Sequence, residues 1–226
     1  MATELQLELA NRGGGRMVMS HKATLTFASG VVGVISGSSV TGGSGGTGGQ
    51  YPLGFTGGVL AAGGSPAVGV FFVNGSGALT AVQILSPGLY STAPTAFDLT
   101  ACPGLTGASA TLNSAQVSVV NFTAGVGPMG IPNGSRVLKI RSFTSTALSG
   151  SPSAANVTVG TAFGDASYVA NTDCKAQGAI DLTLVGAGIA NLRNTVGPFA
   201  VVGIVAGSTT AAGTIEVDIE FAPPNP

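Results

Sequence analysis

Charged, aromatic and metal-binding side chains are scarce in this sequence. Its 226 residues include no tryptophan, three tyrosines, one histidine and two cysteines, and charged residues make up 8% of the chain, with a net charge of −1. No basic cluster is large enough to neutralise a row of phosphates, so we expect neither a nucleic-acid partner nor an anionic membrane surface. Gly, Ser, Thr and Pro interrupt every hydrophobic stretch, so no transmembrane helix is expected.

The motifs that formally match catalytic or cofactor sites lack their required context. No carboxylate or cysteine lies near His21 with the spacing of metal ligands, and a histidine-based triad also needs a nucleophile and an acid. Gly42–Gly46 matches the G-x-S-x-G pattern, but no helix and no histidine follow. Gly125–Gly130 matches G-x-G-x-x-G, but a turn follows and the next acid is Asp165. We therefore expect no enzyme, cofactor or metal site, with a hydrolase centred on His21 as the enzymatic alternative.

Cysteine usage and the N-terminus bear on the compartment. Cys102 and Cys174 are far apart, and two cysteines do not make the dense framework of a small secreted domain. We expect two free, buried thiols. The first residues carry Glu4 and Glu8 and no basic region, so they are not expected to be a secretory signal.

Alternating hydrophobic residues predict an all-β protein of the sandwich or barrel type. The clearest strand is "TIEVDIEF", in which every second residue from Ile215 to Phe221 is apolar and the residues between are acidic. In "RVLKIRSF" the same alternation predicts Leu138 and Ile140 on one face, with Lys139 and Arg141 on the other. The one stretch with a weak helical signal is 164–178.

Glycine, with 37 residues in the chain, dominates the part before residue 113. Two stretches, 29–73 and 75–112, share a plan of short strands and glycine turns, which suggests a repeated β-unit. Six of the eight residues of Gly42–Gly49 are glycine. This segment is interpreted as an enlarged turn between two strands of the repeat, with a flexible linker as the alternative. The predicted divisions are an N-terminal arm at 1–28, a glycine-rich repeat region at 29–112 and a β-sandwich at 113–226.

Two groups of basic residues stand out in a chain with so few charges: Arg12 and Arg16 near the N-terminus, and Arg136, Lys139 and Arg141 on one predicted strand. They form either the polar face of half-buried strands or a grip for a carboxylate-bearing partner. The acidic face of the strand at 215–221 is interpreted as solvated, which discourages edge-to-edge aggregation. A weak calcium site or a charged partner contact is the alternative.

Two motifs resemble proteins of tailed-phage particles. "SPGLYSTAPT" and "GLTGASAT" are similar to a β-rich repeat of phage fibre and head-decorating proteins, through Gly88, Tyr90, Ala93, Pro94 and Thr95 and through Gly107, Ala108, Ala110 and Thr111. The last part of the chain resembles the terminal domain of capsid decoration (cement) proteins. The strand "VTVG" at Val157–Gly160 and the segment Ala212–Val217 carry that second likeness.

The resemblance implies a jelly-roll-like β-sandwich and a non-enzymatic role. Such a protein binds the major capsid protein on the outer face of a phage head, is a homotrimer, and is made in the bacterial cytoplasm, where thiols stay free. The expected capsid or self contacts are the alternating N-terminal residues and the basic residues: Leu5, Leu7, Leu9, Arg12, Arg16, Arg136, Lys139 and Arg141. The alternative is a tail-fibre or head-fibre adhesin module that binds a host surface glycan.

Overall fold

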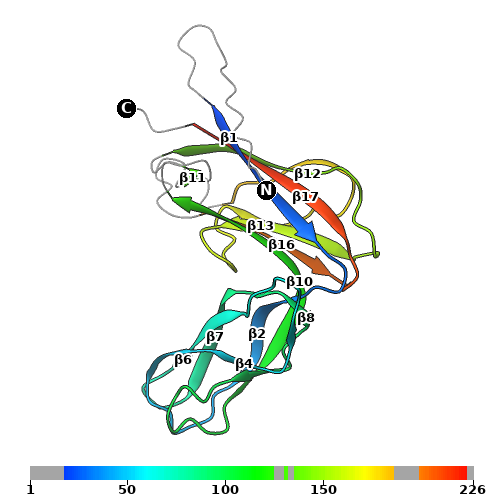
Figure 1. Ribbon diagram of the computed structural model, residues 1–226. Coiled ribbons are helices and arrows are strands. Elements are labelled where there is room, and N and C mark those ends of the chain that lie inside the picture. Colours follow the sequence, from blue (N-terminus) through cyan, green and yellow to red (C-terminus); the bar gives the residue numbers. More distant parts are fainter. Residues whose placement is uncertain (1–17, 125–129, 132–134, 186–198, 223–226) are drawn as a thin grey trace. The chain divides into compact units, whose positions relative to one another are not determined.

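The protein is described by a computed structural model that covers residues 18–124, 130–131, 135–185 and 199–222 (Figure 1). Every regular element among these residues is a β-strand, which confirms the prediction of an all-β protein. The chain forms two compact units. The sandwich unit comprises residues 1–27, 118–207 and 211–226, and the glycine-rich unit comprises 28–117 and 208–210. The sequence placed the divisions after residues 28 and 112; β10 (Ser109–Ala124) belongs to both units.

The sandwich unit is built from two sheets. One sheet has the order β1-β17-β12-β15, with antiparallel neighbours throughout. The other has the order β11-β10-β16-β13-β14, in which the short β11 runs parallel to β10. Their bounds are β1 Met19–Phe27, β11 Gly130–Ile131, β12 Arg136–Thr144, β13 Ala154–Gly160, β14 Val169–Asp173, β15 Gly178–Asp181, β16 Phe199–Ala206 and β17 Gly213–Ala222.

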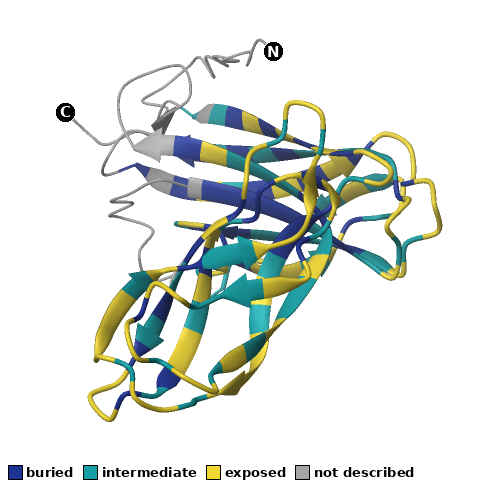
Figure 2. Ribbon diagram, turned by 60° about the horizontal axis from the view of Figure 1, so that its bottom comes forward, coloured by how far each residue is buried: buried dark blue, intermediate teal, exposed yellow. Residues whose placement is uncertain are grey.

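The core of the sandwich unit follows from the period-2 pattern of its strands. In β17 the apolar residues from Ile215 to Phe221 are fully buried, whereas Glu216, Asp218 and Glu220 stay partly exposed, as the sequence predicts. Leu25 of β1 and Val157 of β13 join the same apolar cluster, so both sheets contribute to it (Figure 2). Burying one such side chain stabilises the fold by roughly 1.5–3 kcal/mol.

The face assignment in β12 is wrong for one residue. Leu138 was expected beside Ile140, but Leu138 is 38% exposed and Ile140 is fully buried. The pairing of β12 with β17 shifts register between Val137 and Lys139, which is a β-bulge. Because a bulge inserts one extra residue, the side chains before and after it alternate out of phase. Val137 takes the buried position instead.

The weak helical signal at 164–178 is also wrong. Asp165 accepts hydrogen bonds from the backbone and hydroxyl of Thr161 at 2.7 Å each, and from those of Ser167 at 3.0 and 2.9 Å. These hydrogen bonds stabilise a turn at a position where the sequence predicted the start of a helix. The chain then enters β14 and pairs with β13, so sheet pairing and not helix formation satisfies its backbone.

The glycine-rich unit consists of short antiparallel pairings. Three strands form a sheet of order β3-β6-β7, β4 pairs with β9, β5 pairs with β8, and β2 pairs with the first part of β10. Their bounds are β2 Gly33–Thr41, β3 Gly49–Pro52, β4 Gly54–Thr56, β5 Val59–Leu60, β6 Val68–Val73, β7 Leu79–Ser86, β8 Tyr90–Thr92 and β9 Ala96–Asp98. Strands from 29–73 pair with strands from 75–112, so the two stretches form one interleaved body. The internal repeat stays a prediction.

The segment Gly42–Gly49 is part of this packed body. Ser44 and Thr106 exchange backbone hydrogen bonds at 2.9 Å, and the N–H of Gly46 donates to the carbonyl of Gly77 at 3.0 Å. Gly43 has a φ of 65°, and a Cβ there would lie 2.3 Å from the Thr106 carbonyl oxygen. Glycine is therefore required for close backbone approach. The flexible-linker alternative is wrong.

Candidate interaction surface

Three of the eight predicted contact residues lie within described strands. Leu5, Leu7, Leu9, Arg12 and Arg16 fall outside the described residues. The backbone of Arg136 opens β12 opposite Ala222, and its side chain is outside the described part. Lys139 and Arg141 project from β12 on the outer face of the sheet β1-β17-β12-β15, the face directed away from the core.

Ion pairs connect the strands across this outer face. Lys139 Nζ lies 2.7 Å from Asp181 Oδ2, and the Nε of Arg141 lies 3.3 Å from Asp181 Oδ1. An Arg141 terminal nitrogen also lies 3.8 Å from the Glu220 carboxylate. These carboxylates belong to β15 and β17, the two neighbours of β12. The prediction that the basic residues grip a partner's carboxylates stays untested, but the chain's own acids already lie against them.

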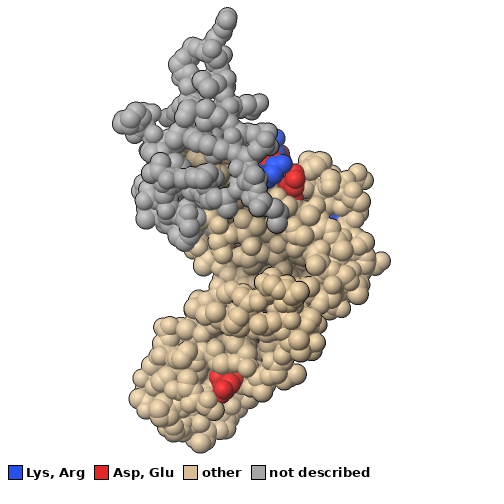
Figure 3. Space-filling model, in the orientation of Figure 1, with Lys and Arg blue, Asp and Glu red and all other residues tan. Residues whose placement is uncertain are grey.

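The same pattern continues at the edge of the sheet. Lys22 Nζ of β1 lies 2.8 Å from Glu216 Oε2 of β17, with Asp218 on the next outward position. Among the side chains that the structure describes, the outer face carries three cations and four carboxylates; we call these residues the charged face. Its members are Lys22, Lys139, Arg141, Asp181, Glu216, Asp218 and Glu220. On the face drawn in Figure 3, the visible charged atoms of the described residues form small patches among uncharged residues.

The solvent exposure of these ion pairs determines how much they contribute to stability. The side chain of Asp181 is 66% exposed and that of Arg141 is 47% exposed. The hydrogen bond from Lys139, together with the charge of Arg141, lowers the pKa of Asp181 below its ordinary value, so it is ionised at neutral pH. Exposed ion pairs add little stability because water and salt screen them. The pattern of charge is better suited to selecting a partner than to holding the fold.

Apolar side chains lie beside these charges. Phe143, on the same strand as Arg141, is 45% exposed, and Leu138 at the bulge is also exposed. Exposed aromatic residues together with arginine are enriched where proteins bind one another. The sequence placed Lys139 and Arg141 outward, but it missed Phe143, whose alternation with them was the available signal.

His21, the centre of the hydrolase alternative, is a buried residue of β1. It is 2% exposed, and its ring stacks on Phe221 with centroids 5.2 Å apart and lies 5.8 Å from the ring of Phe122. A general base has to come within hydrogen-bond reach of its substrate. The enclosed position of His21 therefore gives the hydrolase alternative no support.

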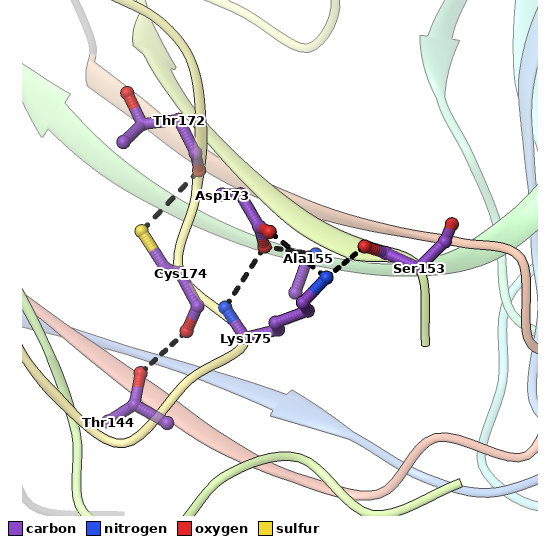
Figure 4. Close-up of polar contacts among 7 residues, drawn as sticks. All are labelled: Thr144, Ser153, Ala155, Thr172, Asp173, Cys174 and Lys175. Atoms are coloured by element: carbon purple, nitrogen blue, oxygen red, sulfur yellow. Dashed lines mark hydrogen bonds and ion pairs between the residues drawn. The ribbon is translucent and has the colours of Figure 1, made fainter. Parts of the chain in front are cut away.

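Both cysteines are free and buried, as predicted. Cys174 lies at the end of β14 in a group of polar contacts shown in Figure 4. Its carbonyl accepts from Thr144 Oγ1 at 2.8 Å, its thiol donates to the Thr172 carbonyl at 3.4 Å, and burial raises the pKa of the thiol. The neighbouring Asp173 accepts from the backbone N–H of Ala155 at 2.9 Å and of Lys175 at 3.1 Å. The thiol is thus a buried packing group that donates to the Thr172 carbonyl and accepts a hydrogen bond from Ser142 Oγ at 3.1 Å.

Metal sites and membrane helices are not found in the described residues. No group of three His, Cys, Asp or Glu side chains there is arranged to hold a metal ion. None of the described segments forms a helix with the length and apolar character that crossing a membrane requires. No family model, curated protein or solved structure matches the chain. The charged face is thus the surface on which the predicted contacts can be examined.

Proposed function

We propose that this chain is a phage capsid decoration protein whose sandwich unit is a jelly roll that binds the outer face of the capsid. The observation that carries the jelly-roll part of this proposal is the order in which the strands of the unit pair. Setting aside the two-residue β11, the described strands of the unit nest: β1 pairs with β17, β10 with β16, β12 with β15 and β13 with β14.

This nesting is what a jelly roll requires. The first strand of the series pairs with the last strand, the second strand with the second-last, and so on inward. In addition, β17 pairs with β12, and β16 pairs with β13. A long antiparallel hairpin wrapped around a barrel axis produces that order, with two Greek keys in two sheets. Jelly rolls occur in viral shells and also in lectins and cupins, so the fold alone does not decide the function. The phage-like motifs at 88–95, 107–111, 157–160 and 212–217 favour the virion role.

The charged face is the proposed contact with the major capsid protein. A protein that binds only the assembled shell stabilises that state by mass action, and many identical copies multiply the effect. The resemblance to decoration proteins implies a homotrimer, and a closed, symmetric trimer of this chain on the shell is part of the proposal. The role requires no catalysis and no cofactor.

Copy number in the particle tests this function. The chain is quantified against the major shell subunit in purified particles of the phage that encodes it. A copy number comparable to that of the shell subunit is the expected result. A number matching only a few fibres would favour the adhesin alternative, and absence from the particles would overturn both virion roles.

A further inference from the structure

The glycine-rich unit contains one charged residue, Asp98. Between Lys22 and Arg136 the sequence has no other Lys, Arg, Asp or Glu. Figure 3 shows a single red patch on the otherwise neutral surface of this unit. A lone carboxylate on a neutral surface has no cation in its own unit to pair with. The position of Asp98 therefore decides whether its carboxylate only stabilises a turn or can also bind a ligand.

Asp98 lies in the wall of a hollow of about 360 Å³. The wall consists of the end of β4, β9 with the two residues after it, and the segment that leads into β10. Its lining residues belong to the glycine-rich unit alone. Pockets for small ligands in proteins begin at about 300 Å³, so the hollow is large enough for a small molecule.

The carboxylate is held in place and charged. The backbone N–H of Thr100 donates to Asp98 Oδ1 at 2.9 Å. Hydrogen bonds from Thr100 lower the pKa of Asp98 below its ordinary value, so it is ionised at neutral pH. An ionised carboxylate has about four acceptor positions, of which the turn uses only a part. The remaining positions can accept hydrogen bonds from a ligand.

The rest of the lining is neutral and mixed in character. Thr56, Thr100 and Ser109 bring hydroxyl groups, and Phe97 and Leu105 bring apolar surface. Hydroxyls both donate and accept, the carboxylate only accepts, and the apolar part suits C–H groups. A ligand with several hydroxyls and apolar C–H faces matches this combination, whereas an anion would be repelled by Asp98.

We infer that this hollow is a binding site for a neutral saccharide, with Asp98 accepting hydrogen bonds from sugar hydroxyls. This inference does not depend on the capsid role of the sandwich unit. A decoration protein with such a site would display a glycan-binding surface on every copy. The glycan-binding activity that the sequence assigned to an adhesin would then be a second property of the same chain.

Titration of the full-length chain with neutral sugars tests the site. The probes are methyl α-D-glucoside, methyl β-D-galactoside and N-acetyl-D-glucosamine, added up to millimolar concentrations, and the readout is amide NMR. We expect at least one probe to shift amides of residues 97–100 and 107–110. Asp98→Asn should weaken that binding about tenfold or more, because a charged acceptor is lost while the amide oxygen still caps the turn.

Two matched variants sharpen the result. Ser109→Ala removes one hydroxyl of the lining and should weaken binding less than Asp98→Asn does. Lys175→Ala removes one exposed charge from the other unit and should leave sugar binding unchanged. The inference is overturned if no probe shifts these amides, or if Asp98→Asn binds as well as the unaltered chain. Binding of methylammonium in place of the sugars, abolished by salt, would likewise overturn it in favour of a cationic ligand.

Discussion

At the scale of single residues, Asp165 determines the connection between β13 and β14. Burial alone would raise the pKa of its carboxyl, but the four hydrogen bonds from Thr161 and Ser167 outweigh burial and lower it. A group whose pKa is lower in the folded chain stabilises the fold at pH values above its unfolded pKa, about 3.9 for aspartate. Asp165 therefore contributes stability at neutral pH that is lost as the pH falls through its folded pKa.

Asp165→Ala tests this account. We expect it to lower the free energy of unfolding of the sandwich unit by roughly 1–3 kcal/mol at neutral pH, because the donors of Thr161 and Ser167 lose their acceptor. The deficit should shrink as the pH falls from the unfolded pKa of aspartate, about 3.9, through the lower folded pKa of Asp165, because the unaltered carboxyl then becomes protonated as well. Urea unfolding at a series of pH values measures both effects. A deficit independent of pH would contradict the role of the charge.

The sequence did not reveal the role of Asp165. Its region held few strong strand formers, and Ala166, Tyr168 and Val169 are compatible with a helix as well as a strand. Which structure forms is decided by pairing with β13, a partner that cannot be read from the local pattern. In β17, by contrast, only one face of the strand is buried, so apolar and polar residues alternate with a period of two in the sequence. That strand could be assigned with its inward and outward residues.

At the scale of elements, the glycine strip Gly42–Gly49 shows why composition misleads. A run of glycines is typical of a linker, yet here it allows the chain to approach 104–108 and the turn at 74–77 closely. A run of glycines shows no alternation of apolar and polar residues, so the packing partners of Gly42–Gly49 could not be predicted from the sequence. The bulge in β12 escaped prediction for a related reason, since a register shift depends on the paired strand β17.

Gly43→Ala, compared with Gly107→Ala, separates crowding from backbone strain. Both glycines have left-handed φ, 65° and 67°, so alanine carries a similar conformational cost of about 1–2 kcal/mol at either position. Only at Gly43 would the new Cβ meet backbone, whereas nothing lies within 4 Å of it at Gly107. We expect Gly43→Ala to destabilise the glycine-rich unit more than Gly107→Ala does.

Amide hydrogen exchange of Ser44 and Thr106 measures the difference. These residues exchange the hydrogen bonds that Gly43 adjoins, so Gly43→Ala should accelerate their exchange more than Gly107→Ala does. Equal acceleration in the two variants would show that close approach at Gly43 contributes nothing. Amides of β17 in the sandwich unit provide an internal reference.

A substitution on the charged face should weaken capsid binding without a matching loss of stability. Arg141→Ala removes the cation that contacts both Asp181 and Glu220. Because these contacts are exposed, thermal unfolding should change little. Under the proposed function, binding to capsids that lack the chain should weaken and lose part of its salt dependence. Co-sedimentation at low and moderate salt measures this.

Lys175→Ala is the matched control for Arg141→Ala. It removes a cation that pairs with Asp173 near the end of β14, away from the charged face. Capsid binding should be unchanged. If Arg141→Ala binds capsids as tightly as the unaltered chain, the charged face is not the shell contact. The sequence did point to Arg141 and Lys139, but it could not identify their acids, because Asp181 becomes a neighbour only when β15 pairs with β12.

At the scale of the whole molecule, residues 28–117 of the glycine-rich unit are an insertion between β1 and β10, which are consecutive among the described strands of the sandwich unit. The chain leaves β1 after Phe27 and returns at Ser118 within β10. The backbone N–H of Thr26 donates to Ser118 Oγ at 3.0 Å, so the points of departure and return are adjacent. A unit whose ends lie close together can be removed without stretching the remaining chain.

We therefore expect the sandwich unit to fold when residues 28–117 are replaced by a short Gly-Ser linker from Phe27 to Ser118. The pairings β1–β17, β12–β17 and β13–β16 use none of the removed residues, and a shorter connection between β1 and β10 lowers the entropic cost of closing it. Amide NMR spectra and thermal unfolding measure folding, and co-sedimentation measures capsid binding. Under the proposed function, capsid binding is retained, and under the inference about the Asp98 hollow, sugar binding disappears.

Deletion of Gly42–Gly49 alone is the contrasting variant. It is much the smaller change, yet it removes the backbone partners of Gly77, Leu79 and Thr106 and leaves the rest of the glycine-rich unit in place. We expect that unit to unfold and expose its apolar residues, so the variant should aggregate sooner than the full excision. If the smaller deletion were well tolerated and the full excision were not, the two units would depend on each other for folding, and the insertion could not be treated as a separable domain.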